Sequence, residues 1–161
     1  MKLKQINNKF QKYFETYEIA SLYVCNTKQP SQIYALFDDK LQDLIVWARE
    51  GIGRAFYANN WRVHEKLKQS NPGLVKFSQR GYRTNDDPVC KAQKFVPGSA
   101  HFKGMALDFD VKGMTAEQVR KWLYENQEDA PVRFRVEKGV NWVHVDVMPH
   151  KASDKAYFFN P

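Results

Sequence analysis

The chain has 161 residues, with 25 lysines and arginines against 18 aspartates and glutamates, which gives a formal net charge of +7. This length suffices for one domain with a substantial core, and we expect residues 1–161 to form a single domain and a monomer. The two cysteines, Cys25 and Cys90, exclude a disulfide framework, and neither belongs to a C-x-x-C pair, so free thiols are expected. The positive charge favours an anionic partner but does not distinguish nucleic acid, a membrane surface and bacterial cell wall.

The hydropathy pattern excludes a membrane-spanning helix, because no apolar run approaches the roughly 18 residues that such a helix requires. Residues 1–5 are followed by no apolar segment of the kind found in signal peptides. We therefore expect a protein that lies outside the membrane and lacks an export signal of its own.

The first third of the chain is predicted to be helical. Residues 7–20 carry Phe10, Phe14 and other aromatic residues at helical spacing, which favours an amphipathic helix with an aromatic core face. Residues 26–31 are expected to form a loop. A capping box of Asp39 and Gln42 predicts a second helix that ends at the glycines near residue 51. We treat residues 1–40 as a helical extension with no assigned role.

The middle of the chain contains one predicted strand and two irregular stretches. Residues 55–63 are rich in aromatic and β-favouring residues and predict a strand that carries Trp61. Residues 66–73 are expected to form a basic, polar loop. Residues 84–98 combine prolines, glycines and aspartates, which predicts an irregular loop over the surface, and loops beside a site often contact the substrate.

The stretch of residues 97–111 combines a histidine, a glycine and a strand that displays a carboxylate. Alternation within residues 105–111 places Leu107 and Phe109 on one face and Asp108 on the other. His101 precedes this carboxylate by seven residues, and Gly104 allows the loop between them to bend sharply. A histidine and a carboxylate placed in this way are typical of a metal site.

The last part of the chain supplies a third potential ligand. A capping box of Thr115 and Gln118 predicts a helix to about residue 126, and a hairpin of residues 132–137 and 140–147 is expected beside the strand that bears Asp108. In its second strand the valines form the apolar face, so His144 lies on the same face as Asp108. Two histidines, one carboxylate and an open fourth position are typical of a catalytic zinc site.

Each of these three residues also has a simpler interpretation. His101 taken alone fits a surface loop, Asp108 a solvated aspartate, and His144 a strand histidine that is satisfied by hydrogen bonds. The two remaining histidines, His64 and His150, are expected to be ordinary surface residues, and Cys90 lacks a second thiol that would make it a zinc ligand.

Four short motifs together resemble a known family, the zinc-dependent D-Ala-D-Ala carboxypeptidase and Hedgehog-like group of the M15 type. These motifs are Ser99 with His101 and Asp108, then Trp142 with His144, then Gly81, Tyr82 and Arg83, and finally Asn59, Asn60 and Trp61. The likeness is strongest to short phage-encoded, endolysin-like members and covers roughly residues 41–147. Residues 1–40 and the last dozen residues resemble nothing in that family.

The resemblance implies an α+β domain of the Hedgehog/DD-peptidase fold, with a small antiparallel sheet, helices on one face and a zinc site on the other. It implies a zinc metallopeptidase that hydrolyses peptide bonds in peptidoglycan stem peptides, in the host cytoplasm before lysis or on a virion. D-Ala-D-Ala, L-Ala-D-Glu and cross-link bonds all remain open as the target. His101, Asp108 and His144 would bind Zn²⁺.

A hydrolase also needs a general base, and two carboxylates share the site face. Glu137 is our predicted base, because family members carry a glutamate shortly before the tryptophan and histidine, although it also fits an exposed turn residue paired with Lys138. Asp146 is the second candidate and also fits a group that orients a ligating histidine. The resemblance makes Arg83 the group that binds a substrate carboxylate, with a surface salt bridge as its simpler interpretation.

Ser99 and Trp142 are predicted to contact the substrate as well, although Ser99 also fits a residue that caps its loop. Two rival functions stay open for the whole chain. One is a non-catalytic zinc-containing binding or virion structural protein of the same fold, because Hedgehog relatives keep the metal geometry while acting as ligands. The other is a nucleic-acid-binding module, which no recognised motif supports.

Overall fold

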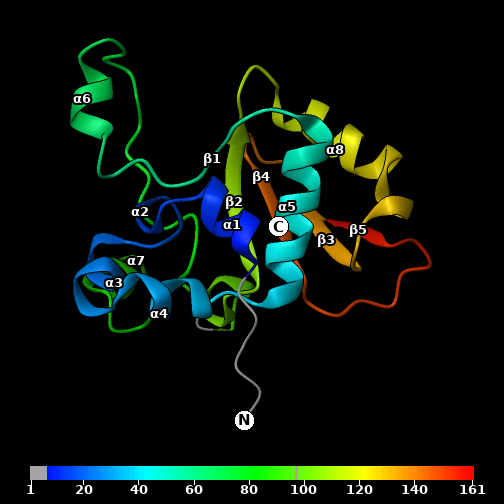
Figure 1. The fold of residues 1–161 in the computed structure, drawn as a ribbon, viewed down its shortest axis with the longest axis horizontal. Coiled ribbons are helices and arrows are strands. Elements are labelled where there is room, and N and C mark those ends of the chain that lie inside the picture. The colour runs from blue at the N-terminus through cyan, green and yellow to red at the C-terminus, as the bar shows by residue number, and fades with distance from the viewer. Residues whose placement is uncertain (1–6, 97) are drawn as a thin grey trace.

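A five-stranded mixed sheet organises the chain in a computed structural model that describes residues 7–96 and 98–161 (Figure 1). Its strand order is β1-β2-β4-β3-β5. The strands are β1 (Phe56–Tyr57), β2 (Ala106–Val111), β3 (Phe134–Glu137), β4 (Val143–Asp146) and β5 (Ala156–Phe159). All neighbouring pairs are antiparallel except β3 and β5, which run parallel. The α+β class is therefore confirmed, whereas the expectation of an antiparallel sheet was wrong.

The centre of the sheet follows the predicted pattern. Strands β3 and β4 form the expected hairpin, and Gly139 in its turn has a φ of 76°, a conformation that favours glycine. Strand β4 then pairs with β2, so that Asp108 lies opposite His144 and Phe109 lies opposite Val143. Because side chains alternate along each strand, this register places the polar residues of both strands on one face and the apolar residues on the other.

Helices cover the apolar face of the sheet. Helix α5 (Asp39–Ile52) and helix α8 (Ala116–Glu125) contribute Leu44, Ile45, Val119 and Leu123 to one buried cluster with the strand residues. The N-cap of α5 is Asp38, whose carboxylate accepts a hydrogen bond from the amide of Lys40. The predicted capping box of Asp39 and Gln42 was therefore wrong, and Gln42 instead donates to the carbonyl of Phe37. The capping box predicted for α8 is confirmed.

The N-terminal segment is part of the same core and is not a peripheral extension. The predicted single helix is divided into α1 (Asn8–Tyr13) and α2 (Thr16–Ile19), because the chain is extended at Phe14 and Glu15 caps α2. Phe10, Phe14 and Ile19 are fully buried against the residues of the sheet and α5. Helices α3 (Leu22–Thr27) and α4 (Pro30–Ala35) follow, so the expected loop is confined to the two residues between them.

Two surface segments precede the motif of His101 and Asp108. The predicted strand over residues 55–63 is reduced to β1, because the Asn60 side chain accepts a hydrogen bond from the amide of Phe77 and closes an excursion that contains α6 (His64–Lys68). Residues 84–96 are irregular except for α7 (Pro88–Gln93), which Asp87 caps. Two short 3₁₀ helices, η1 (Ala100–Lys103) and η2 (Gln127–Asp129), complete the elements.

Two sequence predictions involve positions outside the described residues. The prediction about an export signal concerns residues 1–6, and the motif predicted to bind a metal begins at Pro97; both positions lie outside the described residues. Within the described part of the chain, the structure contains no helix whose length and hydropathy would let it traverse a bilayer.

Candidate metal centre

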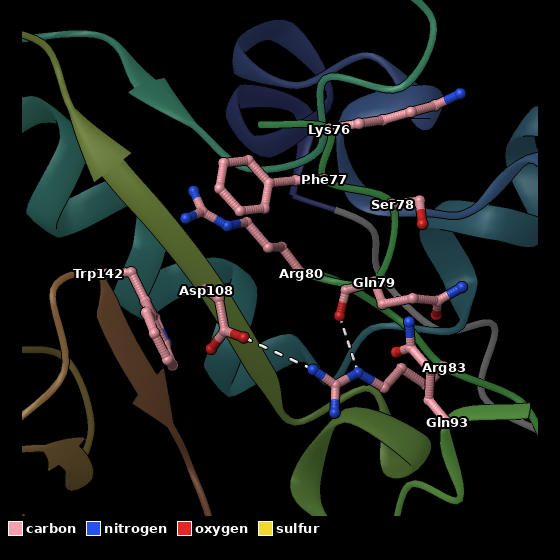
Figure 2. A pocket seen from close by; sticks show the side chains of 9 residues that line it. All are labelled: Lys76, Phe77, Ser78, Gln79, Arg80, Arg83, Gln93, Asp108 and Trp142. Carbon is pink, nitrogen blue, oxygen red and sulfur yellow. Dashed lines mark hydrogen bonds and ion pairs between the residues drawn. The ribbon is translucent and has the colours of Figure 1, made fainter. Parts of the chain in front are cut away.

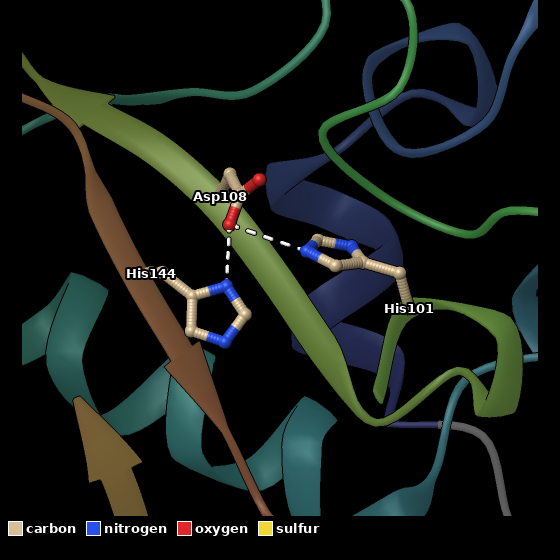
Figure 3. Close-up of side chains that lie close together, drawn as sticks. All are labelled: His101, Asp108 and His144. Atoms are coloured by element: carbon tan, nitrogen blue, oxygen red, sulfur yellow. Dashed lines mark hydrogen bonds and ion pairs between the residues drawn. The ribbon is translucent and has the colours of Figure 1, made fainter. Parts of the chain in front are cut away.

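Three side chains meet on the polar face of the sheet: His101, Asp108 and His144 (Figure 3). Asp108 and His144 are partners across the β2–β4 pair, and η1 brings His101 toward them. The Nδ1 atom of His144 lies 2.6 Å from Asp108 Oδ1, and the Nε2 atom of His101 lies 3.3 Å from the same oxygen. All three residues are almost fully buried, and their potential ligand atoms lie within 4.8 Å of one another. The group predicted from the sequence is therefore assembled.

The outer nitrogen of each histidine is held by a second group. His101 Nδ1 lies 2.8 Å from the carbonyl oxygen of Gly81, which fixes it as a donor because a carbonyl only accepts. His144 Nε2 lies 3.0 Å from Asp146 Oδ2. One nitrogen of each ring is thereby occupied, and the other faces the Asp108 carboxylate. An outer hydrogen bond on one nitrogen, with the other nitrogen directed at a shared carboxylate, is the arrangement found in metal-binding histidines.

The donor set fits a divalent transition metal. Two imidazole nitrogens and one carboxylate oxygen suit zinc and its neighbours better than magnesium or calcium, which favour oxygen alone. In a tetrahedral zinc site with bonds of about 2.0–2.1 Å, neighbouring ligand atoms are about 3.3 Å apart. The His101–Asp108 spacing of 3.3 Å matches this value, and the His144–Asp108 spacing of 2.6 Å is that of a hydrogen bond, which a metal would replace.

The pKa values of Asp108 and His144 depend strongly on the neighbouring charges and hydrogen bonds. Burial by itself would raise the pKa of Asp108, but the hydrogen bonds and positive charge of His101 and His144 outweigh it and hold that pKa well below its usual range. Burial would lower the pKa of His144, but its hydrogen bonds to Asp108 and Asp146 raise it to about 9. Without a metal, His144 therefore binds a proton on both ring nitrogens at neutral pH.

Asp146 is positioned to orient His144. It is fully buried, and Arg135 binds it with two parallel hydrogen bonds of 2.7 and 2.9 Å. The amide of Met148 donates a third hydrogen bond to the same carboxylate. Burial would raise the pKa of Asp146, but His144 and Arg135 lower it. Both oxygens are thus engaged, which suits a positioning role.

The N-terminal segment holds the backbone around the site. A Cβ atom on Gly81 would lie 1.9 Å from the carbonyl oxygen of Ile19, and one on Gly104 would lie 1.8 Å from that of Leu36. Gly104 also has a φ of 66°, as the predicted sharp bend requires. The amide of Tyr82 donates to Ile19 O, which fixes the segment that supplies Arg83. Sequence reasoning missed this role because it depends on contacts between distant segments.

A pocket of about 240 Å³ opens beside the metal centre (Figure 2). Asp108, Arg83 and Trp142 lie in its lining. The Arg83 guanidinium donates to the carbonyl of Gln79 at 2.8 Å, approaches Asp108 Oδ2 at 3.7 Å and lies over the ring of Phe95. Burial lowers the pKa of Arg83, and Asp108 partly offsets this effect. A fixed guanidinium therefore stands next to the candidate metal.

Two further predicted site residues carry unpaired polar atoms. Ser99 Oγ and Trp142 Nε1 are both buried without a hydrogen-bond partner in the described part of the chain. Glu137 is half-buried at the end of β3, opposite Phe159 of β5, and is not among the residues that line the pocket. The structure thus brings Arg83 and Trp142 to the pocket, whereas Ser99 and Glu137 do not line it.

The remaining histidines and Cys90 lie away from the metal centre. His64 is buried, with its ring nitrogens against Glu65 and the carbonyl of Leu74, so its prediction as a surface residue was wrong. His150 is half-buried and bonds the carbonyl of Lys155. Cys90 is buried and bonds Gln79, outside the metal-binding group.

Comparisons of the chain with models of protein families, with curated proteins and with solved structures found no match. The inference of a metal centre therefore depends on the geometry of this chain. Its strongest element is the pair of outer hydrogen bonds, which leaves one nitrogen of each histidine directed at Asp108.

Proposed function

We propose that this protein is a zinc metallopeptidase that hydrolyses peptide bonds in peptidoglycan stem peptides. The observation that carries the proposal is the buried group of His101, Asp108 and His144. Each histidine forms a hydrogen bond through its outer ring nitrogen, and Asp108 lines the adjacent pocket. The M15-like motifs, and the Hedgehog/DD-peptidase fold that they imply, support the choice of metal and reaction. When bound, zinc supplies Lewis-acid polarisation of the scissile carbonyl and activation of water.

Arg83 binds a carboxylate of the substrate in this proposal. Its Nε atom is already fixed by Gln79 O, and Phe95 supports the face of the guanidinium. The planar group is therefore oriented before substrate arrives, which lowers the entropy cost of binding. Because Arg83 lies 3.7 Å from Asp108, a carboxylate bound to it would lie next to the reacting bond.

Ser99 and Trp142 complete the substrate contacts. Their buried, unpaired polar atoms lose hydrogen bonds to water without replacement, which costs free energy until a ligand provides partners. A peptide backbone offers both: a carbonyl can accept from the Trp142 indole N–H, and an amide N–H can donate to Ser99 Oγ.

Glu137 is the proposed general base, and Asp146 the group that orients His144. Asp146 has both carboxylate oxygens engaged by Arg135, His144 and Met148, so it is poorly placed to accept a further proton. Glu137 shares a strand face with Arg135, the partner of Asp146, because the two lie two positions apart on β3, with only Val136 between them. It would take a proton from the attacking water and pass it to the leaving amine.

Peptidoglycan fits the charge of the chain, because a protein of net charge +7 is attracted to an anionic wall. In an endolysin-like role, the enzyme would act from the host cytoplasm at lysis or from a virion. The substrate contacts proposed above require neither nucleic acid nor a membrane.

Digestion of purified peptidoglycan by the zinc-loaded protein tests the proposal, with the released termini identified by mass spectrometry. We expect one zinc per chain and new amino termini within the stem peptides. His144→Ala should lose both zinc and activity, whereas His150→Ala removes a histidine away from the metal centre and should retain both. Stoichiometric zinc without release of any peptide would refute the peptidase and favour a non-catalytic zinc protein.

A further inference from the structure

A second pocket, of about 410 Å³, lies next to the first along β2. Asp108 lines the first pocket and Asp110 the second, and residues two apart on a strand share a face about 6–7 Å from each other. Phe77 and Arg80 line both pockets, so the two pockets are adjacent. Figure 2 shows Phe77 and Arg80 on one side of Asp108 and Arg83 on the other. An extended substrate that contacts Arg83 in the first pocket would therefore pass Asp108 on its way to the second pocket.

The walls of the second pocket are largely apolar. Its aromatic and aliphatic lining comprises Tyr17, Tyr57, Val63, Leu67, Leu74 and Phe77. Two amide side chains also line it, but their polar groups already form hydrogen bonds to the protein backbone. Asn59 bonds the backbone of Arg80 and Ala20, and Asn60 bonds that of Phe77 and Val75. The pocket therefore favours a ligand with a long apolar portion.

Two carboxylates lie in the same lining, and only one of them is neutralised. Arg80 pairs with Asp110 at 2.6 Å. Glu18 accepts a hydrogen bond from the amide of Glu15 through Oε2, but no ion pair involves it within residues 7–96 and 98–161. Burial raises the pKa of Glu18, and the nearby charge of Glu15 adds to this effect. A cation bound beside Glu18 would relieve this cost.

We propose that the second pocket binds the aliphatic, amine-terminated side chain of a diamino acid residue in the substrate. The methylene groups would pack between Tyr57 and Leu67, and the terminal ammonium would pair with Glu18. This inference deepens the proposed function and rests on it, because a diamino acid is the residue through which peptidoglycan stem peptides are cross-linked. A metal centre flanked by Arg83 and this pocket would then select a peptide with a carboxylate on one side and a diamino acid on the other.

Binding of two small compounds to the zinc-loaded, ¹⁵N-labelled protein tests this assignment. Nα-acetyl-L-lysine N-methylamide carries the required side chain, and Nα-acetyl-L-norleucine N-methylamide has the same aliphatic chain without the ammonium. In amide NMR spectra, the lysine compound should shift the signals of Glu18, Tyr57 and Leu67 and bind about tenfold more tightly than the norleucine compound, as expected for a charge-assisted hydrogen bond.

Glu18→Gln should abolish this preference, because glutamine keeps an oxygen that can accept from the Glu15 amide but carries no charge. Glu15→Gln is the matched control: it removes the same charge three residues away, outside the pocket lining, and should leave the preference intact. Equal affinity for the two compounds, shifts elsewhere in the chain, or a preference that survives Glu18→Gln would each overturn the proposal. Neither compound requires hydrolysis, so this outcome is independent of whether the protein cleaves peptidoglycan.

Discussion

Replacement of Asp146 by asparagine separates the two roles that a carboxylate near the metal centre can have. Asparagine keeps the size of the side chain and one oxygen acceptor, but it loses the negative charge that faces His144 Nε2 and Arg135. If Asp146 orients and polarises His144, the main effect falls on metal affinity. If Asp146 is the general base, the main effect falls on turnover with zinc still bound.

The expected loss of zinc affinity follows from the contacts of Asp146. Asp146 is fully buried, its carboxylate lies 3.0 Å from His144, and Arg135 holds it through two hydrogen bonds, so the histidine has a fixed and charged partner. Loss of such an outer partner weakens metal binding by about 10–100-fold, which corresponds to about 1.4–2.7 kcal/mol. Once zinc is saturating, turnover should recover to within about tenfold of the native value, whereas loss of a base costs roughly 10²–10⁴.

The assay is competition for zinc against a chromogenic chelator at fixed pH, followed by turnover at saturating zinc. Asp110→Asn is a matched control, because Asp110 is also paired with an arginine but does not contact a candidate ligand. We expect this control to bind zinc as the native protein does. Native zinc affinity in Asp146→Asn would refute the orienting role, and full zinc occupancy with lost turnover would make Asp146 the base.

Four other predictions concern the same centre. Glu137→Gln should retain zinc while turnover falls by roughly 10²–10⁴, and an active variant would exclude Glu137 as the base. Arg83→Lys keeps the charge but not the planar fork, so catalytic efficiency should fall with zinc content unchanged; native kinetics would remove it from the site. Gly81→Ala, whose Cβ would meet a backbone carbonyl at 1.9 Å, should destabilise the fold by about 1–3 kcal/mol or more in thermal unfolding, whereas Gly98→Ala enters open space and should not. In metal-free protein, the pKa of His144 is raised from 6.5 to about 9, so the charged histidine stabilises the fold fully below pH 6.5 and this stabilisation is lost as pH rises through 9. The unfolding temperature of the native protein should therefore fall toward that of His144→Ala over this pH range. A difference in unfolding temperature between the two proteins that stays constant with pH would contradict the prediction.

The predicted metal ligands were assembled because strand periodicity determines which residues share a face. Alternation along residues 105–111 and 140–147 predicted that Asp108 and His144 share a face, and the antiparallel register of β2 and β4 then sets them opposite each other. His101 required only a short loop with a glycine at its end. These patterns are local, so they can be predicted from the sequence.

The features that the sequence did not reveal depend on contacts between distant segments. Strand β5 has no alternation of apolar and polar residues, and it exists because it pairs in parallel with β3. The two hydrogen bonds from Arg135 to Asp146 depend on the register that places these residues opposite each other. The strand expected over residues 55–63 lost most of its length because Asn60 bonds the backbone seventeen residues later in the chain. In each case tertiary pairing overrides local preference.

The residues with recognisable chemistry lie between Gly81 and Asp146, yet the backbone that fixes them lies partly in the first forty residues. Carbonyl groups of Ile19 and Leu36 lie against Gly81 and Gly104. A side chain at Gly81 would displace the segment that bears Arg83, and one at Gly104 would displace the loop between His101 and Asp108. Phe10 is completely buried, which stabilises the folded state by about 1.5–3 kcal/mol and helps to hold the N-terminal segment in place. The N-terminal segment therefore supports the candidate metal centre, because it sets the positions of the Gly81 carbonyl that orients His101 and of the neighbouring Arg83.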